Sequence, residues 1–375
     1  MKTLVSLIGD QTIPNLEIIK EFQNQCDKFI FFHSVKTAQQ AEWIIRAACL
    51  GVKDCLKQEI DPFNITEIQN VLQTYPFGDE SFILNITGGT KPWIIAFLDK
   101  FKDLGAEIYY VTGKPREFMK IFPRKGKSIL RLEANVNIHE YLIANGFEVK
   151  EGKLTHPQDQ AERFFSAFMA EPVENFFPFM NFFRPLRNSS KTIPLQQLRE
   201  DFLDVLNKIS YTSKSDLLDK NDFKYFSGDW LEEWVYYRVK NELNLADSDI
   251  ITGTHITKMN TPNEMDVMFL IDHQLHVIEC KTAVFEEREL DGQMKLTNIL
   301  GETIYKSDAL RSKLGLFAKS TILTLSELLD IDLKPLQKFQ SHFDRANLSN
   351  ITIISRRKLL NEVNFSKILE IRYAH

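Results

Sequence analysis

The sequence predicts an α/β protein with a doubly wound parallel sheet in its N-terminal part and a mixed sheet in its C-terminal part. The chain has 375 residues, which is enough for two or three domains of ordinary size. Its first ~130 residues alternate short apolar runs with amphipathic segments, a pattern typical of parallel sheets covered on both faces. Beyond residue 228, two apolar runs are joined by a tight turn, which indicates a hairpin.

The composition excludes several classes of protein. Hydrophobic residues make up 43% and charged residues 26%, which is incompatible with a largely disordered chain. The net charge of −5 argues against a protein that coats nucleic acid. The four cysteines form no Cys-x-x-Cys pair, so no zinc ribbon is expected and a cytoplasmic location is favoured. No signal peptide, membrane span or membrane partner is expected, because no apolar run reaches ~18 residues.

Hydrophobic periodicity predicts the N-terminal elements. Strands are expected at four apolar runs, residues 4–8, 28–33, 81–86 and 107–111. Helices are expected at four stretches between and around them, residues 14–25, 37–50, 65–72 and 90–101. Thr37 and Thr90 stand where they can cap two of these helices. Because strands and helices alternate, the predicted architecture is doubly wound.

The middle of the chain differs from both ends. Basic residues dominate 114–131, which forms either a solvated surface or the lining of a cleft that guides a polyanion. A small helix and a hairpin are expected over 135–155. Eight phenylalanines fall within 164–183, interrupted by Pro172 and Pro178, so this segment cannot be one long helix. We expect these rings to be buried, either at a domain junction or at a subunit interface.

The C-terminal hairpin places three charged residues close together. Asp266 lies near the start of its first strand, 265–271, and the second strand is 275–281. Glu279 and Lys281 share one face of the second strand, because side chains alternate along a strand. Neighbouring carboxylates repel, and the oxygen ligands suit Mn²⁺ or Mg²⁺. The arrangement fits metal-assisted phosphodiester hydrolysis, with the lysine orienting water or offsetting phosphate charge.

Residues near this hairpin are secondary candidates. Glu232 and Glu233 start a predicted helix that precedes the hairpin, and one of them can point toward the site. Glu264 shares a face with Asp266 and is a second-tier ligand. Tyr305 and Lys306 lie on a later helix, where they either contact phosphate or are solvated. The remaining predicted elements are a helix and two strands, residues 302–314, 320–325 and 350–354.

Three further residues on the hairpin are expected to have structural roles only. His273 and His276 flank the turn, and solvated histidines are expected there rather than metal ligands. Cys280 alternates with Glu279 and is therefore expected in the core.

This context resembles the PD-(D/E)xK nuclease superfamily, whose fold is called restriction-endonuclease-like. The resemblance rests on residues 263–267, Asn-Glu-Met-Asp-Val, and 277–281, Val-Ile-Glu-Cys-Lys, with Met265 in place of the usual proline. Residues 228–232, Gly-Asp-Trp-Leu-Glu, fall where the superfamily carries a helical glutamate. An ordinary surface hairpin is the alternative. The resemblance implies the catalytic residues Asp266, Glu279, Lys281 and Glu232, and the metal ligands Asp266, Glu279 and Glu232.

Two loops at the carboxyl ends of predicted strands are candidates for ligand binding. They are residues 9–15, Gly-Asp-Gln-Thr-Ile-Pro-Asn, and 85–91, Asn-Ile-Thr-Gly-Gly-Thr-Lys. Ligands of doubly wound sheets bind at this edge, and helix N-termini there attract anions. The spacing fits neither a GxGxxG nor a Walker A loop, and a plain β–α connection is the alternative. The candidate residues are Gly9, Asp10, Gln11, Thr12, Asn15, Thr87, Gly88, Gly89, Thr90 and Lys91, with Thr112 and Gly113 as weaker ones.

Together the two loops resemble CARF domains, the CRISPR-associated Rossmann-fold sensors. The whole chain is similar to the CARF-domain ancillary nucleases of type III CRISPR systems. This resemblance implies a CARF-like domain at 1–134, a phenylalanine-rich bridge at 135–225 and a nuclease domain at 226–375. It also implies a homodimer whose two-fold cleft binds a cyclic oligoadenylate, with cyclic tetra-adenylate favoured. Binding would switch on cleavage of DNA and/or RNA in antiviral defence.

Two other functions stay open at this stage. A CARF-type regulator would hold nucleic acid without cutting it, but the intact charged set on the hairpin argues against this. A constitutive DNA nuclease would need no activator, and the two N-terminal loops argue against that. The residues do not decide whether the sensor also degrades its ligand.

Overall fold

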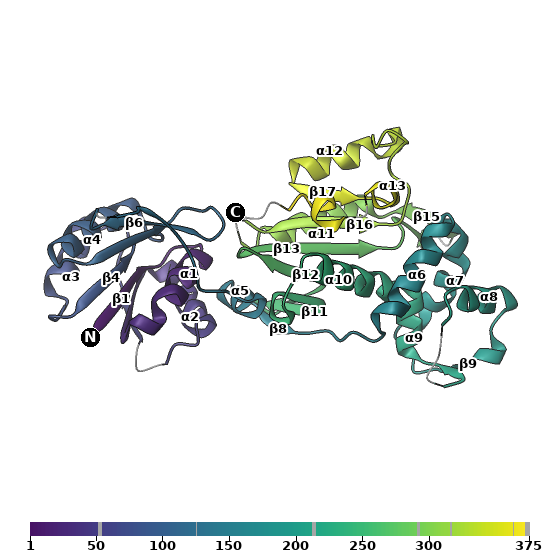
Figure 1. The fold of residues 1–375 in the computed structure, drawn as a ribbon, viewed down its shortest axis with the longest axis horizontal. Coiled ribbons are helices and arrows are strands. Elements are labelled where there is room, and N and C mark those ends of the chain that lie inside the picture. The colour runs from purple at the N-terminus through teal and green to yellow at the C-terminus, as the bar shows by residue number, and fades with distance from the viewer. Residues whose placement is uncertain are drawn as a thin grey trace.

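The computed structural model describes residues 1–51, 55–124, 126–211, 215–290, 293–315, 317–362 and 364–371. An N-terminal α/β unit, a central unit with a mixed sheet and a helical segment follow one another along the long axis of the molecule (Figure 1). This arrangement confirms the predicted fold class, a mostly parallel N-terminal sheet followed by a mixed C-terminal sheet.

The N-terminal unit has a seven-stranded sheet in the order β3-β2-β1-β4-β5-β6-β7. The first five strands in the chain pair in parallel, and the last two add antiparallel. The strand order reverses at β1, so the carboxyl ends of β1 and β4 form a topological switch point. The strands are β1 (Lys2–Leu7), β2 (Lys28–His33), β3 (Cys55–Glu59), β4 (Ser81–Asn85), β5 (Glu107–Val111), β6 (Glu117–Phe122) and β7 (Ile129–Arg131).

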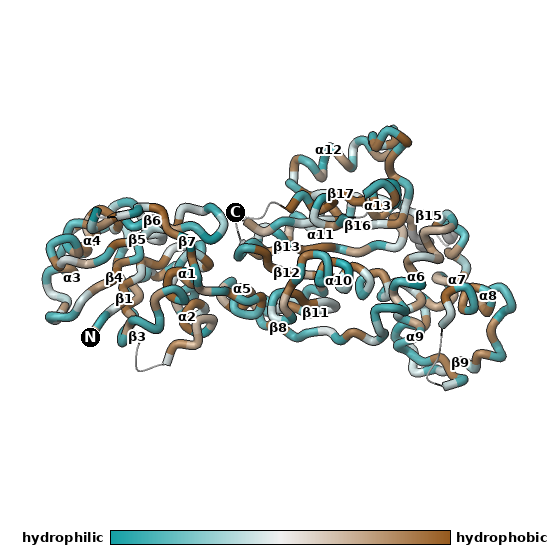
Figure 2. The backbone as a smooth tube through the Cα atoms, viewed as in Figure 1, coloured by the Kyte–Doolittle hydropathy of each residue, from teal (hydrophilic) through white to brown (hydrophobic). Residues whose placement is uncertain are grey.

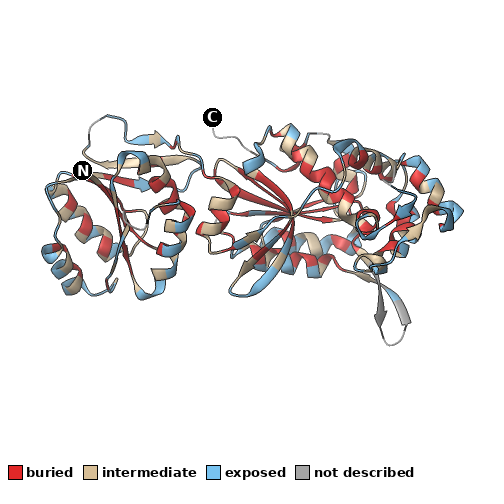
Figure 3. Ribbon diagram, turned by 90° about the horizontal axis from the view of Figure 1, so that it is seen from below, coloured by how far each residue is buried: buried red, intermediate tan, exposed pale blue. Residues whose placement is uncertain are grey.

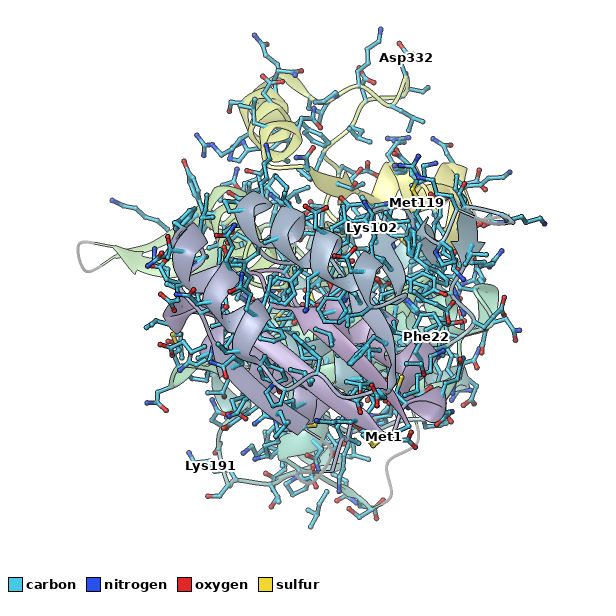
Figure 4. All side chains as sticks on the ribbon, turned by 90° about the vertical axis from the view of Figure 1, so that its left-hand side faces the viewer. Met1, Phe22, Lys102, Met119, Lys191 and Asp332 are labelled. Carbon is cyan, nitrogen blue, oxygen red and sulfur yellow. The ribbon has the colours of Figure 1, made fainter. Side chains whose placement is uncertain are left out.

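Helices cover both faces of this sheet because its central strands are apolar on both faces. Leu4 and Phe31 pack with Ile44 on one face, whereas Val5 and Phe32 pack against the other. In Figure 4, which looks along the long axis, α4 with the labelled Lys102 lies in front of the strands. The helices are α1 (Ile13–Phe22), η1 (Gln23–Gln25), η2 (Val35–Thr37), α2 (Ala38–Ala47), α3 (Ile65–Thr74) and α4 (Lys91–Asp103).

Three features of the N-terminal unit differ from the prediction. Strand β3 was not expected, because it is a polar edge strand without an apolar run. The basic stretch forms the antiparallel pair β6 and β7, and Arg116 donates to the backbone carbonyls of residues 132–134. Lys125 lies outside the described residues. Thr37 and Thr90 occupy N-cap positions, but neither side chain caps its helix.

The C-terminal unit has a six-stranded sheet in the order β17-β16-β13-β12-β11-β8. Strands β13, β16 and β17 pair in parallel, and the others pair antiparallel. The strands are β8 (Glu148–Lys150), β11 (Ile250–Lys258), β12 (Thr261–Ile271), β13 (Gln274–Lys281), β16 (Lys319–Thr324) and β17 (Ile351–Ile354), and β14 (Phe285–Leu290) pairs separately with β15 (Gln293–Asn298). The helices are η8 (Asp247–Asp249), α10 (Trp230–Glu242), α11 (Leu300–Arg311), η9 (Gln337–Phe339), α12 (Gln340–Leu348), α13 (Arg356–Asn361) and α14 (Phe365–Ile368).

The segment after the N-terminal sheet connects the two units. Helix α5 (Ile138–Ala144) lies between them (Figure 1), and the following strand β8 pairs with β11 at the edge of the mixed sheet. The hairpin expected over 135–155 is therefore wrong, because its second strand comes from a distant part of the chain. One continuous apolar cluster runs from Val111 through Tyr141 of α5 to Leu275 of β13.

The phenylalanine-rich stretch is broken into separate helices, as its prolines predict. The backbone tube carries brown, hydrophobic stretches along α6 and α7 in Figure 2, and the phenylalanine rings of this segment pack on Trp230 of α10 and on Phe226. Five of the eight rings are almost fully buried within this one chain, which supports the domain-junction interpretation. The elements here are α6 (Gln158–Ala170), η4 (Val173–Phe176), α7 (Phe177–Phe183), η5 (Arg184–Leu186), β9 (Ile193–Pro194), η6 (Leu195–Gln197), α8 (Glu200–Lys208), β10 (Leu217–Leu218), α9 (Lys220–Lys224) and η7 (Tyr225–Asp229).

Burial follows the two sheets. Figure 3 shows buried strands inside both units and exposed residues on the outer faces of the helices. No helix within the described ranges is long and apolar enough to cross a bilayer.

Candidate active site and ligand edge

The β12–β13 hairpin brings the two predicted carboxylates together. Val267 pairs with Ile278, and the same register places Asp266 opposite Glu279. Both side chains are buried, with 6% and 4% exposure. Asp266 Oδ2 accepts a hydrogen bond from the Cys280 backbone N–H at 2.6 Å. Like charges opposite each other destabilise a strand pair, so this pair needs nearby cations.

Two lysines supply that positive charge. Lys281 Nζ lies 2.8 Å from Glu279 Oε1 and 3.8 Å from Asp266 Oδ2. Lys306, from α11, donates to the same Glu279 oxygen at 3.1 Å. Lys306 is thus part of the charged cluster, whereas its neighbour Tyr305 is exposed beneath the guanidinium of Arg345. One carboxylate oxygen therefore accepts from two ammonium groups.

This environment separates the protonation behaviour of the two carboxylates. Burial and the neighbouring Glu279 raise the pKa of Asp266 to about 7. Burial also opposes ionisation of Glu279, but Lys281 and Lys306 outweigh it and lower the pKa of Glu279. Burial disfavours the Lys281 cation, yet Asp266 and Glu279 more than compensate and raise the pKa of Lys281. Near neutral pH the site holds one firmly ionised carboxylate beside one that titrates.

The two adjacent glutamates of α10 face different surroundings. Burial raises the pKa of Glu232 well above its usual value, and the negative charges of Asp266 and Asp229 raise it further. Because Asp266 acts on it in this way, Glu232 lies close to the hairpin. Glu233 instead accepts hydrogen bonds from the backbone and hydroxyl of Thr155, the former at 2.5 Å. Glu232 is therefore the glutamate that faces the hairpin. Gly228, with φ of 157°, forms a kink just before the helix.

Sequence reasoning gave no role to one ion pair near this site. Arg187 donates to Asp229 Oδ1 at 2.7 Å and to Ser227 Oγ at 2.9 Å. It thereby ties the helical segment to the start of α10, close to Glu232. No sequence signal links Arg187 to Asp229, because 42 residues separate them.

The donor set can be compared with the needs of a divalent cation. Asp266, Glu279 and Glu232 offer carboxylate oxygens, the ligands that Mn²⁺ and Mg²⁺ prefer. As they stand, no three acidic, histidine or cysteine side chains in the described part of the chain are grouped to hold a metal ion. Lys281 lies against both hairpin carboxylates in this arrangement. The chemistry of the donors fits a hard cation at the hairpin, and Glu264 is exposed beside it.

At the carboxyl ends of β1 and β4, the two predicted loops pack directly on each other. A Cβ added to Gly88 would lie 2.1 Å from the Leu7 carbonyl oxygen and 2.8 Å from the Gly9 nitrogen. Gly89 has φ of +83°, a conformation that favours glycine. Gly88 is therefore required by the close approach of the two loop backbones, and Gly89 by its left-handed conformation.

Buried amides join these loops. Asn85 Nδ2 donates to Asn15 Oδ1 at 2.9 Å, and both residues are fully buried. Asn85 Oδ1 accepts from the Thr87 hydroxyl at 2.6 Å, and that hydroxyl accepts from the Val111 N–H at 2.9 Å. Asn15 and Thr87 thus hold the loops in place in this structure. Thr90 donates to the Pro62 carbonyl oxygen at 2.7 Å.

Other predicted ligand residues are accessible. Asp10, Gln11 and Lys91 are exposed, and Gly9, Gly88 and Gly89 are partly exposed. Thr12 is buried, and its hydroxyl has no hydrogen-bond partner among the described residues. The helices α1 and α4 both begin at this edge, and neither has a side-chain cap at its N-terminus. The edge therefore offers two helix N-termini without side-chain caps beside exposed polar side chains.

The hairpin histidines are not solvated as expected. His276 is buried and stacks on Phe269, with 4.8 Å between ring centroids. His273 is also buried, against the N-terminal unit. The expectation was wrong because the N-terminal unit covers His273 at the turn, and because His276 lies inside the sheet, between β12 and β16. Cys280 is buried, which confirms its expected place in the core.

Comparisons with known proteins agree with both halves of this description. Residues 3–141 match the profile of the Card1 CARF domain, and residues 219–338 match that of the Card1-like endonuclease domain. The fold is similar to Can2 from Sulfobacillus thermosulfidooxidans in complex with cyclic tetra-adenylate, with TM-score 0.69, 21% identity and coverage of 98% of this chain and 99% of that one. It is also similar to VC1899 from Vibrio cholerae, with TM-score 0.73, 16% identity and coverage of 98% and 97%. A comparison with curated protein sequences gives no match.

Proposed function

Because the chain joins a CARF domain to a Card1-like endonuclease domain, we propose that it is a metal-dependent nuclease switched on by a cyclic oligoadenylate. The observation that carries this proposal is the hairpin cluster, in which two buried carboxylates lie against the partly exposed Lys281 and the exposed Lys306. Burying two neighbouring carboxylates is costly unless they act together on a charged substrate or ion.

The residues of the cluster divide the work of phosphodiester hydrolysis. Asp266 and Glu279, with Glu232 nearby, would hold Mn²⁺ or Mg²⁺. Such a cation, when bound, supplies an activated water and polarises a phosphoryl oxygen. Lys281, on the same face as Glu279, is placed to orient water or to offset charge that develops on the phosphate. Lys306 helps to keep Glu279 ionised.

The CARF edge is the proposed site for the activator. Asp10, Gln11 and Lys91 are exposed there, and the unpartnered Thr12 hydroxyl is an available donor nearby. The N-termini of α1 and α4 favour anionic phosphates. Can2, which has a similar fold, was solved with cyclic tetra-adenylate, and this supports the same class of ligand here. A ligand with two-fold symmetry fits a homodimer in which two CARF edges face each other.

A cleavage assay tests the proposal. Purified protein with Mn²⁺ is incubated with labelled single-stranded RNA, single-stranded DNA and supercoiled plasmid, with and without cyclic tetra-adenylate. We expect cleavage that depends on both metal and activator, and the substrate panel assigns DNA, RNA or both. The matched controls omit Mn²⁺ or replace the activator with linear tetra-adenylate.

Two outcomes would overturn parts of the proposal. Equal cleavage with and without activator would make the protein a constitutive nuclease. Activator binding without cleavage of any substrate would make it a CARF-type regulator that binds nucleic acid. Disappearance of the cyclic ligand during the assay, followed by chromatography, would show that the CARF domain also degrades its activator.

A further inference from the structure

The hairpin that carries the active-site carboxylates ends against the CARF domain. Asp272 and His273 form its turn, both in the left-handed region with φ of 48° and 62°. Asp266 stands six residues before Asp272, and Glu279 stands six residues after His273. Two paired strands are stiff, so a displacement of the turn is transmitted to both carboxylates together.

His273 bonds two separate parts of the N-terminal half. Its Nδ1 lies 2.9 Å from Glu17 Oε1 of α1, and its Nε2 accepts the Val136 backbone N–H at 3.2 Å. An N–H can donate only to a lone pair, so Nε2 carries no proton and Nδ1–H donates to Glu17. His273 and Glu17 are 8% and 7% exposed, respectively. Separating these two buried side chains would break a hydrogen bond and leave buried polar atoms without that partner, which is costly.

The other end of this connection is the ligand edge. Helix α1 begins at Ile13, within the first predicted ligand segment, residues 9–15. Asn15, one half-turn before Glu17, is bonded to Asn85 beneath the second ligand loop. Glu17 therefore lies on the first turns of a helix whose N-terminus faces the activator site. A movement of either loop reaches Glu17 through rigid, hydrogen-bonded elements.

The surroundings of the pair leave room for movement. A pocket between the two domains is lined by Gln11, Pro14 and Glu17 on the CARF side and by His273, Gly315 and Phe317 on the endonuclease side. The volume that the centre of a water-sized molecule can occupy in this pocket is about 60 Å³. The pocket is partly open to solvent and lies beside the Glu17–His273 contact, so the two domains are not close-packed at this point.

We propose that the Glu17–His273 contact is the positioning device that couples the activator site to the nuclease site. In this account, which rests on the proposed function, activator binding shifts the N-terminal end of α1. Glu17 then moves His273, and the hairpin brings Asp266 and Glu279 into their active arrangement. The two residues act through the hairpin and do not touch substrate.

The coupling is tested with Glu17→Met, His273→Asn and the double variant. Methionine is similar to Glu17 in length but has no oxygen to accept the His273 N–H, and asparagine tolerates the left-handed turn but is too short to reach residue 17. The matched control is Glu140→Gln, which weakens another α1 contact, Lys20 to Glu140 at 2.6 Å, that does not involve the hairpin. Glutamine at Glu140 keeps the helix-capping pattern of α5.

Three quantities are measured for each variant: cyclic tetra-adenylate affinity by calorimetry, melting temperature, and cleavage rate with and without saturating activator. The activation ratio is the cleavage rate with saturating activator divided by the rate without it. We expect this ratio to fall at least ~10-fold in each single variant, which is within the usual range of allosteric coupling. The double variant should lose no more than either single variant, because both remove the same contact. Activator affinity should change less than ~3-fold, and the control should behave as wild type.

Reciprocity gives a second readout that a purely structural role would not move. In the wild type, a nucleic acid substrate bound without cleavage should tighten activator binding by the same factor by which activator tightens substrate binding. The Glu17 and His273 variants should lose this effect. An unchanged activation ratio in both single variants, or additive losses in the double variant, would overturn the coupling role alone. A wild-type enzyme without any activation would overturn the proposed function itself, and the coupling with it.

Discussion

The proposed nuclease site and the proposed ligand edge both lie on sheets, but different interactions hold their side chains in place. At the proposed nuclease site, Lys281 contacts both buried carboxylates, Asp266 and Glu279, and the exposed Lys306 contacts Glu279, so charge is concentrated there. At the ligand edge, Gly88 and the Asn15–Asn85 amide pair fix two loops by close backbone packing and neutral hydrogen bonds. The first site depends on charge and the second on shape.

This difference indicates which substitutions will damage each site. A change that removes charge but keeps volume should disable the nuclease and leave the sensor intact. A change that adds a single atom but no charge should disable the sensor instead. Each prediction below tests one side of this contrast.

Glu279→Gln should have the largest effect. It keeps the side-chain shape but removes the carboxylate that both lysines contact, so cleavage should fall at least ~1,000-fold. Activator affinity, measured by calorimetry, should stay unchanged. Glu148→Gln, an exposed change on the edge strand β8, is the control and should retain full activity. A joint loss of cleavage and activator binding would contradict the separation of the two sites.

Gly88→Ala tests the shape of the ligand edge. The new methyl would lie 2.1 Å from the Leu7 carbonyl oxygen, so the backbone must shift. We expect activator affinity to fall by ~10-fold or more and stability to fall by about 1–3 kcal/mol. In the control Gly78→Ala, nothing lies within 4 Å of the added Cβ, and no effect is expected. If Gly88→Ala binds activator as the wild type does, the loops do not form the site.

Lys306→Met tests how much the second lysine of the cluster contributes to cleavage. Its loss removes one of the two cations that keep Glu279 ionised, so we expect a decrease in cleavage of about 10- to 100-fold. The decrease should shrink at higher pH, because the remaining carboxylate is then more fully ionised. Lys313→Met, an exposed lysine just after the same helix, serves as the reference variant. Equal pH profiles for Lys306→Met and wild type would remove Lys306 from the cluster.

His276→Leu gives the smallest effect and concerns stability alone. Burial, aided by Lys319, lowers the pKa of His276 to about 3. The unfolded chain takes up this proton near the ordinary pKa of ~6.5 and the folded chain does not, so the histidine destabilises the fold as pH falls below that value. The leucine variant should lose up to about 1.4 kcal/mol per pH unit of this dependence in urea unfolding between pH 8 and pH 5. His255→Leu, at an exposed position, should show little change in slope.

Much of the fold is predictable because its strands are strongly apolar. The expected strands 28–33 and 107–111 coincide with β2 and β5, and the hairpin around Asp266 and Glu279 forms as expected. The polar edge strand β3 carries no such signal. Local patterns therefore predict buried strands well and edge strands poorly.

Other features that sequence reasoning missed depend on contacts between distant segments. Strand β8 joins a sheet whose other strands begin about 100 residues later, with Ile250 of β11. His273 is buried because Glu17 lies against it, 256 residues away in the chain. The sequence does not distinguish Glu232 from Glu233 as the residue that faces the hairpin. The structure does, because Glu233 accepts a hydrogen bond from Thr155 instead. The spacing of residues along the sequence does not predict such contacts between distant segments.

The most direct test of the central claim is to compare activator binding with activation on one preparation. Cyclic tetra-adenylate is titrated against wild-type protein with Mn²⁺, and both calorimetric binding and initial cleavage rate are recorded. The account predicts a rate that rises with occupancy of the CARF edge, with the same midpoint, and a shift of both midpoints to ~10-fold or higher activator concentration in Gly88→Ala. A rate that is independent of occupancy would contradict the claim that the CARF domain controls the nuclease.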